Sequence, residues 1–349
     1  MSTTAVDSAR LPQTISRFWI GLASSVTVAC VLSLAWLYTP GQDHFGAIPR
    51  DGDTSWFLNY EVGYEIQDPE ILFHEIGHSI ENARRADIIF LGSSRILFSL
   101  DRQLLEAFER KHSVRMFNLG LAGVQSGEVP LRIIRKVGLH PKMWIINADL
   151  DVTSDYRSGF FYRTLTGRAV ATQAGRAVDY TRLHALKDVI GRNIRWRLKK
   201  AASLLHPPYA YRSATNGSWD VDNWIYYERT DNPRIALVER RFIDGAYRHV
   251  DRKDESCPAD PNEVKDAAAY RDAIGGALVL IQVPSTFACS QRVHEIAAAL
   301  GVPAFTVDPT QFTSIDGGGH LDGISARNYS TMLFEWLERQ PEFRRLAAR

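Results

Sequence analysis

Short apolar runs alternate with amphipathic segments along much of this chain. Residues 86–91 (Ala-Asp-Ile-Ile-Phe-Leu) are mostly apolar and stop at Gly92, which is typical of a strand buried on both faces. The pattern recurs and predicts strands at 115–119, 143–148, 277–283 and 304–307, and helices at 98–110, 128–137, 291–300 and 323–339. Strands that alternate with helices indicate an α/β fold: a three-layer sandwich built on a mainly parallel sheet.

The alternation of strands and helices stops between Asp149 and about Gly275. This segment of more than a hundred residues is too long for an ordinary connection between two strands of the sheet. We therefore predict an inserted subdomain at 150–275. Within it, apolar residues recur every three or four positions at 183–205 and predict a basic amphipathic helix, which would dock on the protein or lie on a membrane surface. Aromatic residues at 160–162 and 209–227 would form a sugar-stacking groove or the core of the subdomain.

An uncharged, mostly apolar stretch occupies residues 18–38 and would span about 31 Å as a helix, the thickness of a bilayer core. It ends in Trp36-Leu37-Tyr38-Thr39-Pro40 rather than in a small-residue cleavage site, so we predict an uncleaved transmembrane helix. Arg10 and Arg17 precede it, whereas acidic residues predominate after it, and this bias places the N-terminus in the cytoplasm. In a bacterium the chain would be a single-pass inner-membrane protein with a periplasmic C-terminal domain.

These segments divide the chain into predicted parts. Besides the transmembrane helix and the inserted subdomain, the predicted parts are a cytoplasmic tail at 1–17, a linker and lead-in helix at 39–83, an α/β domain formed by 84–149 and 276–340, and a C-terminal tail at 341–349.

Charge and cysteine content narrow the range of partners and metals. The chain has 41 basic and 40 acidic residues, and a net charge of +1 is too weak a field to indicate nucleic acid as a partner. Its three cysteines exclude a four-thiolate zinc site. In an oxidising periplasm, however, Cys257 and Cys289 could form a disulfide.

Three small-residue blocks follow predicted strands or precede the last helix. They are Gly92-Ser93-Ser94-Arg95, Asn118-Leu119-Gly120-Leu121-Ala122-Gly123 and Asp316-Gly317-Gly318-Gly319-His320-Leu321. Serine, histidine and a carboxylate are the components of a nucleophilic acyl-transfer site, and glycine lets a backbone N–H approach an oxyanion. Taken singly, each block also suits an ordinary turn between a strand and a helix.

In this order the blocks resemble the SGNH/GDSL hydrolase superfamily, over roughly residues 84–150 and 277–340. Within it the chain is most similar to the membrane-anchored extracytoplasmic branch that includes alginate O-acetyltransferase-like and teichoic-acid D-alanylation proteins. The resemblance implies a flavodoxin-like three-layer fold. It also implies Ser94 as nucleophile, His320 as general base, Asp316 as the acid that orients it, and the N–H groups of Ser94 and Gly123 as oxyanion donors.

Two features depart from the family pattern. At the end of a further strand the family usually has Gly-x-Asn-Asp, but this chain has Ile146-Asn147-Ala148-Asp149, so Asn147 could take the oxyanion role only with a shifted backbone. Asp316 and His320 are four residues apart instead of three.

The resemblance therefore implies an esterase or O-acyltransferase that needs no cofactor and acts on an acyl ester or a cell-envelope polysaccharide. An acyl-donor membrane protein would be its partner in transfer. The alternative from another class is a non-catalytic envelope-assembly or polysaccharide-binding protein that retains the fold.

A second motif, His74-Glu75-Ile76-Gly77-His78, matches the H-E-x-x-H pattern, in which a helix presents two histidines to zinc and a glutamate activates water. Glu81 and Arg84 stand where the longer zinc-protease motif requires glycine and histidine. A surface helix leading into the first strand is therefore favoured, and a zinc metallopeptidase is the third hypothesis.

Overall fold

The computed structural model describes residues 18–30, 49–50, 53–61, 64–65, 78–121, 128–148, 150–151, 158–159, 209–222, 248–249, 256–286, 288–314 and 319–348. Its central element is a five-stranded sheet in the order β13-β12-β6-β4-β5, in which all neighbours are parallel. The strands are β4 (Ile88–Ser93), β5 (Met116–Leu121), β6 (Met143–Asn147), β12 (Ala277–Ile281) and β13 (Ala304–Phe305). The predicted mixed α/β class with a parallel sheet is confirmed.

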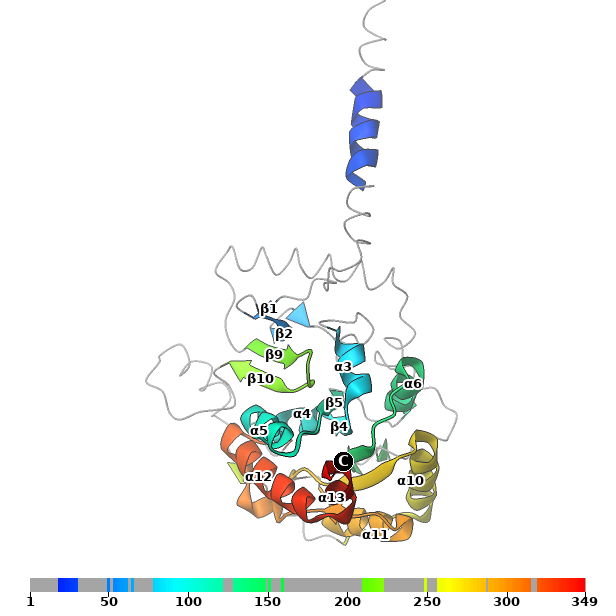
Figure 1. The fold of residues 1–349 in the computed structure, drawn as a ribbon, viewed down its shortest axis with the longest axis vertical. Coiled ribbons are helices and arrows are strands. Elements are labelled where there is room, and N and C mark those ends of the chain that lie inside the picture. The colour runs from blue at the N-terminus through cyan, green and yellow to red at the C-terminus, as the bar shows by residue number, and fades with distance from the viewer. Residues whose placement is uncertain are drawn as a thin grey trace, which may run out of the picture.

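Helices cover both faces of this sheet, and successive strand residues point to opposite faces. Ile89 and Leu91 of β4 belong to one core cluster, whereas Ile88 and Phe90 belong to the other. On the first face lie α3 (Ser79–Arg85), α6 (Glu128–Val137), α10 (Pro261–Ile274) and α11 (Ser290–Leu300). On the second lie α4 (Ser94–Ser99), α5 (Arg102–His112), α12 (Gly323–Arg339) and α13 (Pro341–Ala347). This arrangement is compatible with a three-layer sandwich (Figure 1).

Two of these helices lie outside the ranges predicted for the α/β domain, 84–149 and 276–340. Helix α10 lies inside the range 150–275 assigned to an inserted subdomain, yet its Ala267, Tyr270 and Ile274 are buried in the core of the sheet's first face. A capping box at Asp260 and Glu263 starts this helix. Its alanine-rich sequence has no clear apolar stripe, which explains why the pattern missed it.

The predicted C-terminal tail, 341–349, also contains a helix. Phe343 and Leu346 of α13 are buried against the second face of the sheet. Only two large apolar residues, three positions apart, indicate this helix in the sequence, and that is too short a pattern to distinguish from a tail.

A second, antiparallel sheet combines the predicted linker with the predicted insert. Its order is β1-β2-β9-β10, with β3 also paired to β2. The strands are β1 (Pro49–Arg50), β2 (Asp53–Glu61), β3 (Tyr64–Glu65), β9 (Tyr209–Ser213) and β10 (Trp219–Asp222). Phe57 of β2 is buried in the same core cluster as the parallel sheet, so 39–83 is more than a linker with a lead-in helix.

Shorter elements complete the described parts of the chain. They are β7 (Leu150–Asp151), β8 (Ser158–Gly159), β11 (Arg248–His249), β14 (Thr313–Ser314) and a short 3-10 helix at Pro309–Gln311. Strands β11 and β14 pair antiparallel. The predicted basic helix at 183–205 lies outside the described residues.

The hairpin of β9 and β10 is joined to the edge of the parallel sheet through Arg212. This side chain is fully buried, and its guanidinium donates to the carbonyl oxygens of Gly217 at 3.2 Å and of Asn118 and Gly120 at 3.0 Å. The backbone N–H of Asn118 also donates to the carbonyl of Asn216 at 2.7 Å. The hairpin therefore covers β5, which is the edge strand of the parallel sheet.

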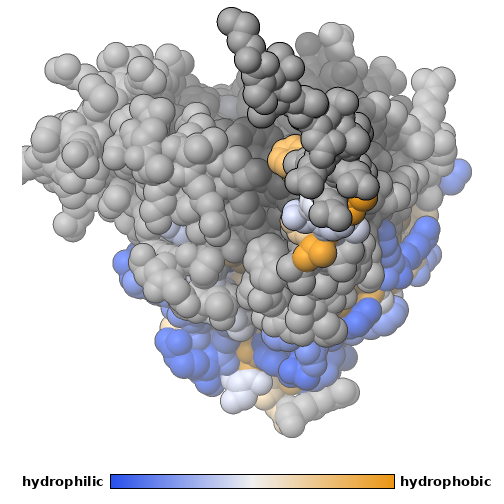
Figure 2. Space-filling view, turned by 90° about the horizontal axis from the view of Figure 1, so that it is seen from above, coloured by the Kyte–Doolittle hydropathy of each residue, from blue (hydrophilic) through white to orange (hydrophobic). Residues whose placement is uncertain are grey.

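Residues 18–30 form a helix whose side chains are exposed, including Phe18, Trp19 and Ile20. Within the described ranges, no helix has both the length and the apolar character needed to cross a membrane. The predicted span, 18–38, extends beyond the described residues. Seen from above, hydrophilic residues predominate toward the lower left and right edges of the coloured surface, and hydrophobic residues show nearer the centre of the view (Figure 2).

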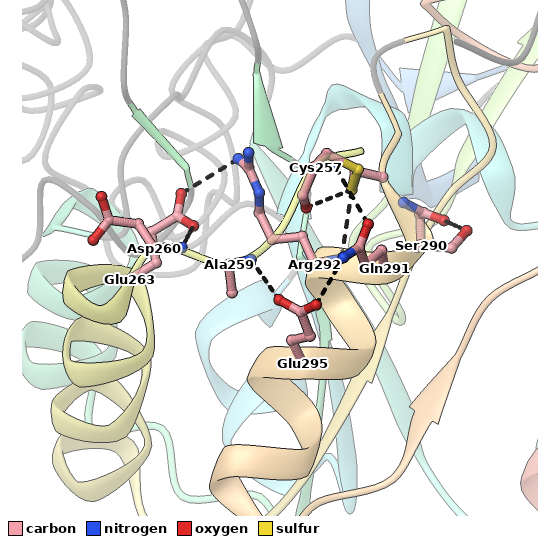
Figure 3. The surroundings of a disulfide bond; sticks show 10 residues. Cys257, Ala259, Asp260, Glu263, Ser290, Gln291, Arg292 and Glu295 are labelled. Carbon is pink, nitrogen blue, oxygen red and sulfur yellow. Dashed lines mark hydrogen bonds and ion pairs between the residues drawn. A yellow bond between two sulfur atoms is a disulfide. The ribbon is translucent and has the colours of Figure 1, made fainter. Parts of the chain in front are cut away.

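A disulfide joins Cys257 and Cys289, the pair that the sequence offered. Cys257 lies just before α10, and Cys289 caps α11, where its Sγ accepts from the N–H of Arg292 at 3.4 Å. An ion pair between Arg292 and Glu263, at 3.4 Å, joins the same two helices (Figure 3). The bridge therefore fastens the starts of α10 and α11 to each other.

Removing this bridge is expected to lower the free energy of unfolding by about 3 to 4 kcal/mol, because the two cysteines are separated by 32 residues and the bridge restricts the unfolded chain. Urea unfolding of the Cys257→Ser, Cys289→Ser double variant measures this loss. Cys30→Ser is the control, since Cys30 is exposed and free. If both bridge cysteines react with an alkylating reagent in the native, unreduced protein, the bridge does not form in solution.

Candidate active site

Ser94 stands at a sharp turn from strand to helix. Strand β4 ends at Ser93 and helix α4 begins at Ser94, with the Ser93 hydroxyl accepting from the N–H of Arg95 at 3.3 Å as the helix cap. Just before the turn, a Cβ on Gly92 would lie only 2.9 Å from the Cβ of Asn147. Glycine is therefore needed where the carboxyl ends of β4 and β6 meet.

The structure brings Ser94 and His320 together although 226 residues separate them in sequence. The Oγ of Ser94 lies 2.7 Å from the Nε2 of His320, and both residues are partly buried. This distance allows the imidazole to take the hydroxyl proton. The pair lies at the carboxyl end of β4, where strand order in the sheet reverses and where ligands bind in open α/β sheets.

The imidazole of His320 is packed against a ring from the same helix that carries Ser94. The ring centroids of Phe98 and His320 are 4.6 Å apart, and Phe98 in turn meets Trp219 edge to face at 4.9 Å. Trp219 belongs to β10, so the antiparallel sheet contributes a ring beside the site. Sequence reasoning missed Phe98, because the helix was predicted to begin there; a helix that begins at Ser94 would have placed the two residues one turn apart.

Asp322, two residues beyond His320, fixes the start of α12. Its Oδ1 accepts from the N–H of Ser325 at 2.7 Å, and its Oδ2 accepts from the hydroxyl of Thr313. This cap holds the backbone that leads out of His320. Asp316, the predicted orienting acid, lies outside the described residues.

The second block supports the helix that carries Ser94. The side chain of Asn118 is buried, donates to the carbonyl of Ile96 at 3.3 Å and accepts from the N–H of Gly120 at 2.9 Å. A Cβ on Gly120 would meet the side chains of Ile96 and Leu97 at 2.6 Å, so glycine lets α4 pack directly on β5. Gly123, the predicted oxyanion donor, lies outside the described residues.

Strand β6 ends with a fully buried Asn147. Its Oδ1 accepts from the N–H of Val283 at 3.1 Å, which ties β6 to the segment after β12. This bond gives Asn147 a structural role that the sequence did not indicate. Its role as an oxyanion donor remains a prediction.

The H-E-x-x-H motif is described only at its last residue. His78 is exposed and has a left-handed backbone, with φ 60° and ψ 28°, immediately before α3 begins at Ser79. This conformation does not fit a helix that runs through His78 and presents it beside a histidine one turn earlier. His74 and Glu75 lie outside the described residues, and the described part of the chain has no group of three or more His, Cys, Asp or Glu side chains suited to a metal.

Comparisons of the chain with protein-family models, curated proteins and solved structures found no match.

Proposed function

We propose that this protein is an SGNH-like esterase or O-acyltransferase in which Ser94 is the nucleophile and His320 the general base. The observation that carries the proposal is the 2.7 Å contact between Ser94 Oγ and His320 Nε2 at the carboxyl end of a parallel strand. Serine is unreactive at neutral pH without such a base, and a nucleophile within hydrogen-bond reach of its base is the signature of this chemistry.

In the proposed reaction the Oγ of Ser94 attacks the ester carbonyl while its proton passes to Nε2 of His320. The tetrahedral intermediate then collapses, the bond to the leaving alcohol breaks, and His320 returns the proton to that alcohol. Water or an acceptor hydroxyl next attacks the acyl group on Ser94 and gives its proton to His320. The bond between the acyl carbon and Oγ then breaks, and His320 returns the proton to Oγ of Ser94. The N–H groups of Ser94 and Gly123, with Asn147, would stabilise the oxyanions, and Asp316 would orient the imidazole.

A cell-envelope carbohydrate is the proposed substrate or acceptor. Trp219 is partly exposed and contacts Phe98, which in turn contacts the imidazole of His320. An aromatic ring offers a flat apolar face of the kind that packs against a sugar ring. For transfer rather than hydrolysis, an acyl-donor membrane protein would supply the acyl group.

The proposed location is the bacterial inner membrane, with residues 18–38 as the anchor and the catalytic domain in the periplasm. The disulfide between Cys257 and Cys289 supports an oxidising compartment. A reporter enzyme that works only in the periplasm is expected to be active when it is fused after residue 60. A reporter that works only in the cytoplasm is expected to be inactive at the same position. Activity of the cytoplasmic reporter at that position would contradict both the orientation and the compartment.

The function is tested by treating the wild-type protein with a serine-directed fluorophosphonate and by measuring acetate release from a small acetyl ester. Covalent labelling together with turnover supports the enzyme. Protein that does neither, yet binds an envelope polysaccharide, would be the non-catalytic alternative.

A further inference from the structure

Helix α4 contributes more to the candidate site than Ser94 alone. The helix has only six residues, Ser94–Ser99, and two others besides Ser94 reach the segment that bears His320. Phe98, four positions after Ser94, contacts the imidazole ring. Arg95, the residue next to Ser94, contacts the backbone just before the histidine.

The contact made by Arg95 is specific and largely shielded from water. The side chain is 9% exposed, and its Nε donates to the carbonyl oxygen of Gly319 at 3.2 Å. Gly319 directly precedes His320, so this bond fixes the peptide that leads into the imidazole. A hydrogen bond from a charged donor is stronger than a neutral one, and burial strengthens it further.

Gly319 has particular need of such a bond. It follows Gly317 and Gly318 in sequence, and a run of glycines has many backbone conformations to lose. After His320, Asp322 caps α12 and fixes the backbone on the other side. The backbone is therefore held on both sides of His320: before it by Arg95 of α4, the helix that also carries Ser94, and after it by the Asp322 cap.

We propose that Arg95 is a positioning residue that holds the backbone of Gly319 and His320, so that Nε2 of His320 stays within hydrogen-bond reach of Ser94. The proposal rests on the proposed function of Ser94 and His320. It makes α4 a single rigid unit that carries the nucleophile and also locates the base. A misplacement of about 1 Å can cost about 100-fold in rate, so such an anchor would act mainly on kcat.

The test compares Arg95→Met and Arg95→Lys with wild type in the full-length protein. Methionine keeps an unbranched apolar side chain that reaches as far as the Nε of arginine but has no donor, whereas lysine keeps a charged donor without the planar guanidinium. Arg95→Met is expected to lower kcat for a small acetyl ester about 10-fold to 100-fold, with KM changed less than about threefold. Arg95→Lys should restore part of the lost kcat.

The second measurement is hydrogen–deuterium exchange of the peptides that contain residues 319–322. This measurement does not depend on whether the protein is catalytically active. Exchange there is expected to rise in Arg95→Met and to rise less in Arg95→Lys. Arg84→Met is the matched control, because the Nε of Arg84 also donates to a backbone carbonyl, that of Val137 at 2.7 Å, at the end of α6. This control should change neither kcat nor exchange at 319–322.

Unchanged exchange at 319–322 in Arg95→Met overturns the proposal, whatever the activity of that variant. Should Arg95→Met fail to fold, the same comparison is made between Arg95→Lys and wild type, and equal exchange in those two proteins overturns it as well. If wild type has no esterase or transferase activity, the proposed function fails by itself, and the exchange measurement still decides whether Arg95 holds His320.

Discussion

Replacement of Ser94 by alanine is expected to abolish fluorophosphonate labelling and to lower acetyl ester turnover by about 10⁴-fold or more. The reason is that labelling requires a serine whose proton can be withdrawn, and Ser94 Oγ lies 2.7 Å from the imidazole nitrogen of His320. Labelling is measured by mass spectrometry of the modified peptide, and turnover by acetate release. His320→Ala should suppress both signals as well, whereas Asp316→Ala is expected to suppress them only partly.

Ser93→Ala is the matched control for this prediction. The Ser93 hydroxyl caps α4, so its loss should cost about 1 kcal/mol of stability while labelling at Ser94 persists. A label found on Ser93, with Ser94→Ala still reactive, would show that the nucleophile is the preceding residue. Labelling that survives His320→Ala at the wild-type rate would contradict the role of His320 as base.

The second large effect is expected at Arg212, where substitution by methionine should lower the free energy of unfolding by about 3 to 5 kcal/mol. The change leaves the carbonyl oxygens of Asn118, Gly120 and Gly217 without the buried guanidinium that now binds them. Because that guanidinium also joins the hairpin of β9 and β10 to β5, the edge of the parallel sheet should open first. Urea unfolding of the full-length protein measures the loss.

Arg345→Met is the control for Arg212. The Arg345 side chain is 73% exposed, pairs with Glu342 three positions away and donates from Nε to the carbonyl oxygen of Pro341 at 3.3 Å, so the loss of these exposed contacts should change stability by less than about 0.5 kcal/mol. Arg212→Lys should fall between the two, since lysine keeps the charge but cannot reach three carbonyls from one planar group. Equal stability of Arg212→Met and Arg345→Met would show that the hairpin is not held by this side chain.

The sequence alone determined the strands and helices whose burial follows a regular period. The apolar runs gave all five parallel strands to within a few residues, and the helices at 128–137 and 323–339 have the predicted bounds. Local pattern suffices there, because a strand buried on both faces must be apolar throughout and a helix on a sheet must have one apolar side. It failed at 98–110, which was predicted as one helix: the structure has α4 (Ser94–Ser99), which the Ser93 cap starts, and then α5 (Arg102–His112), which the Asp101 cap starts.

Only the tertiary structure decided how distant segments combine. Strand β2 pairs with β9 across more than a hundred residues, and Arg212 binds carbonyls of a strand about ninety residues earlier, and neither relation leaves a periodic trace in the sequence. The same holds at the site. The glycine-rich blocks offered Ser94 and His320 separately, but the contact between them depends on a parallel sheet that gathers strand ends at one edge. The role of Arg95 could be recognised only in the tertiary structure. Its partner is a backbone carbonyl, which every residue has, so the sequence does not indicate which carbonyl the side chain binds.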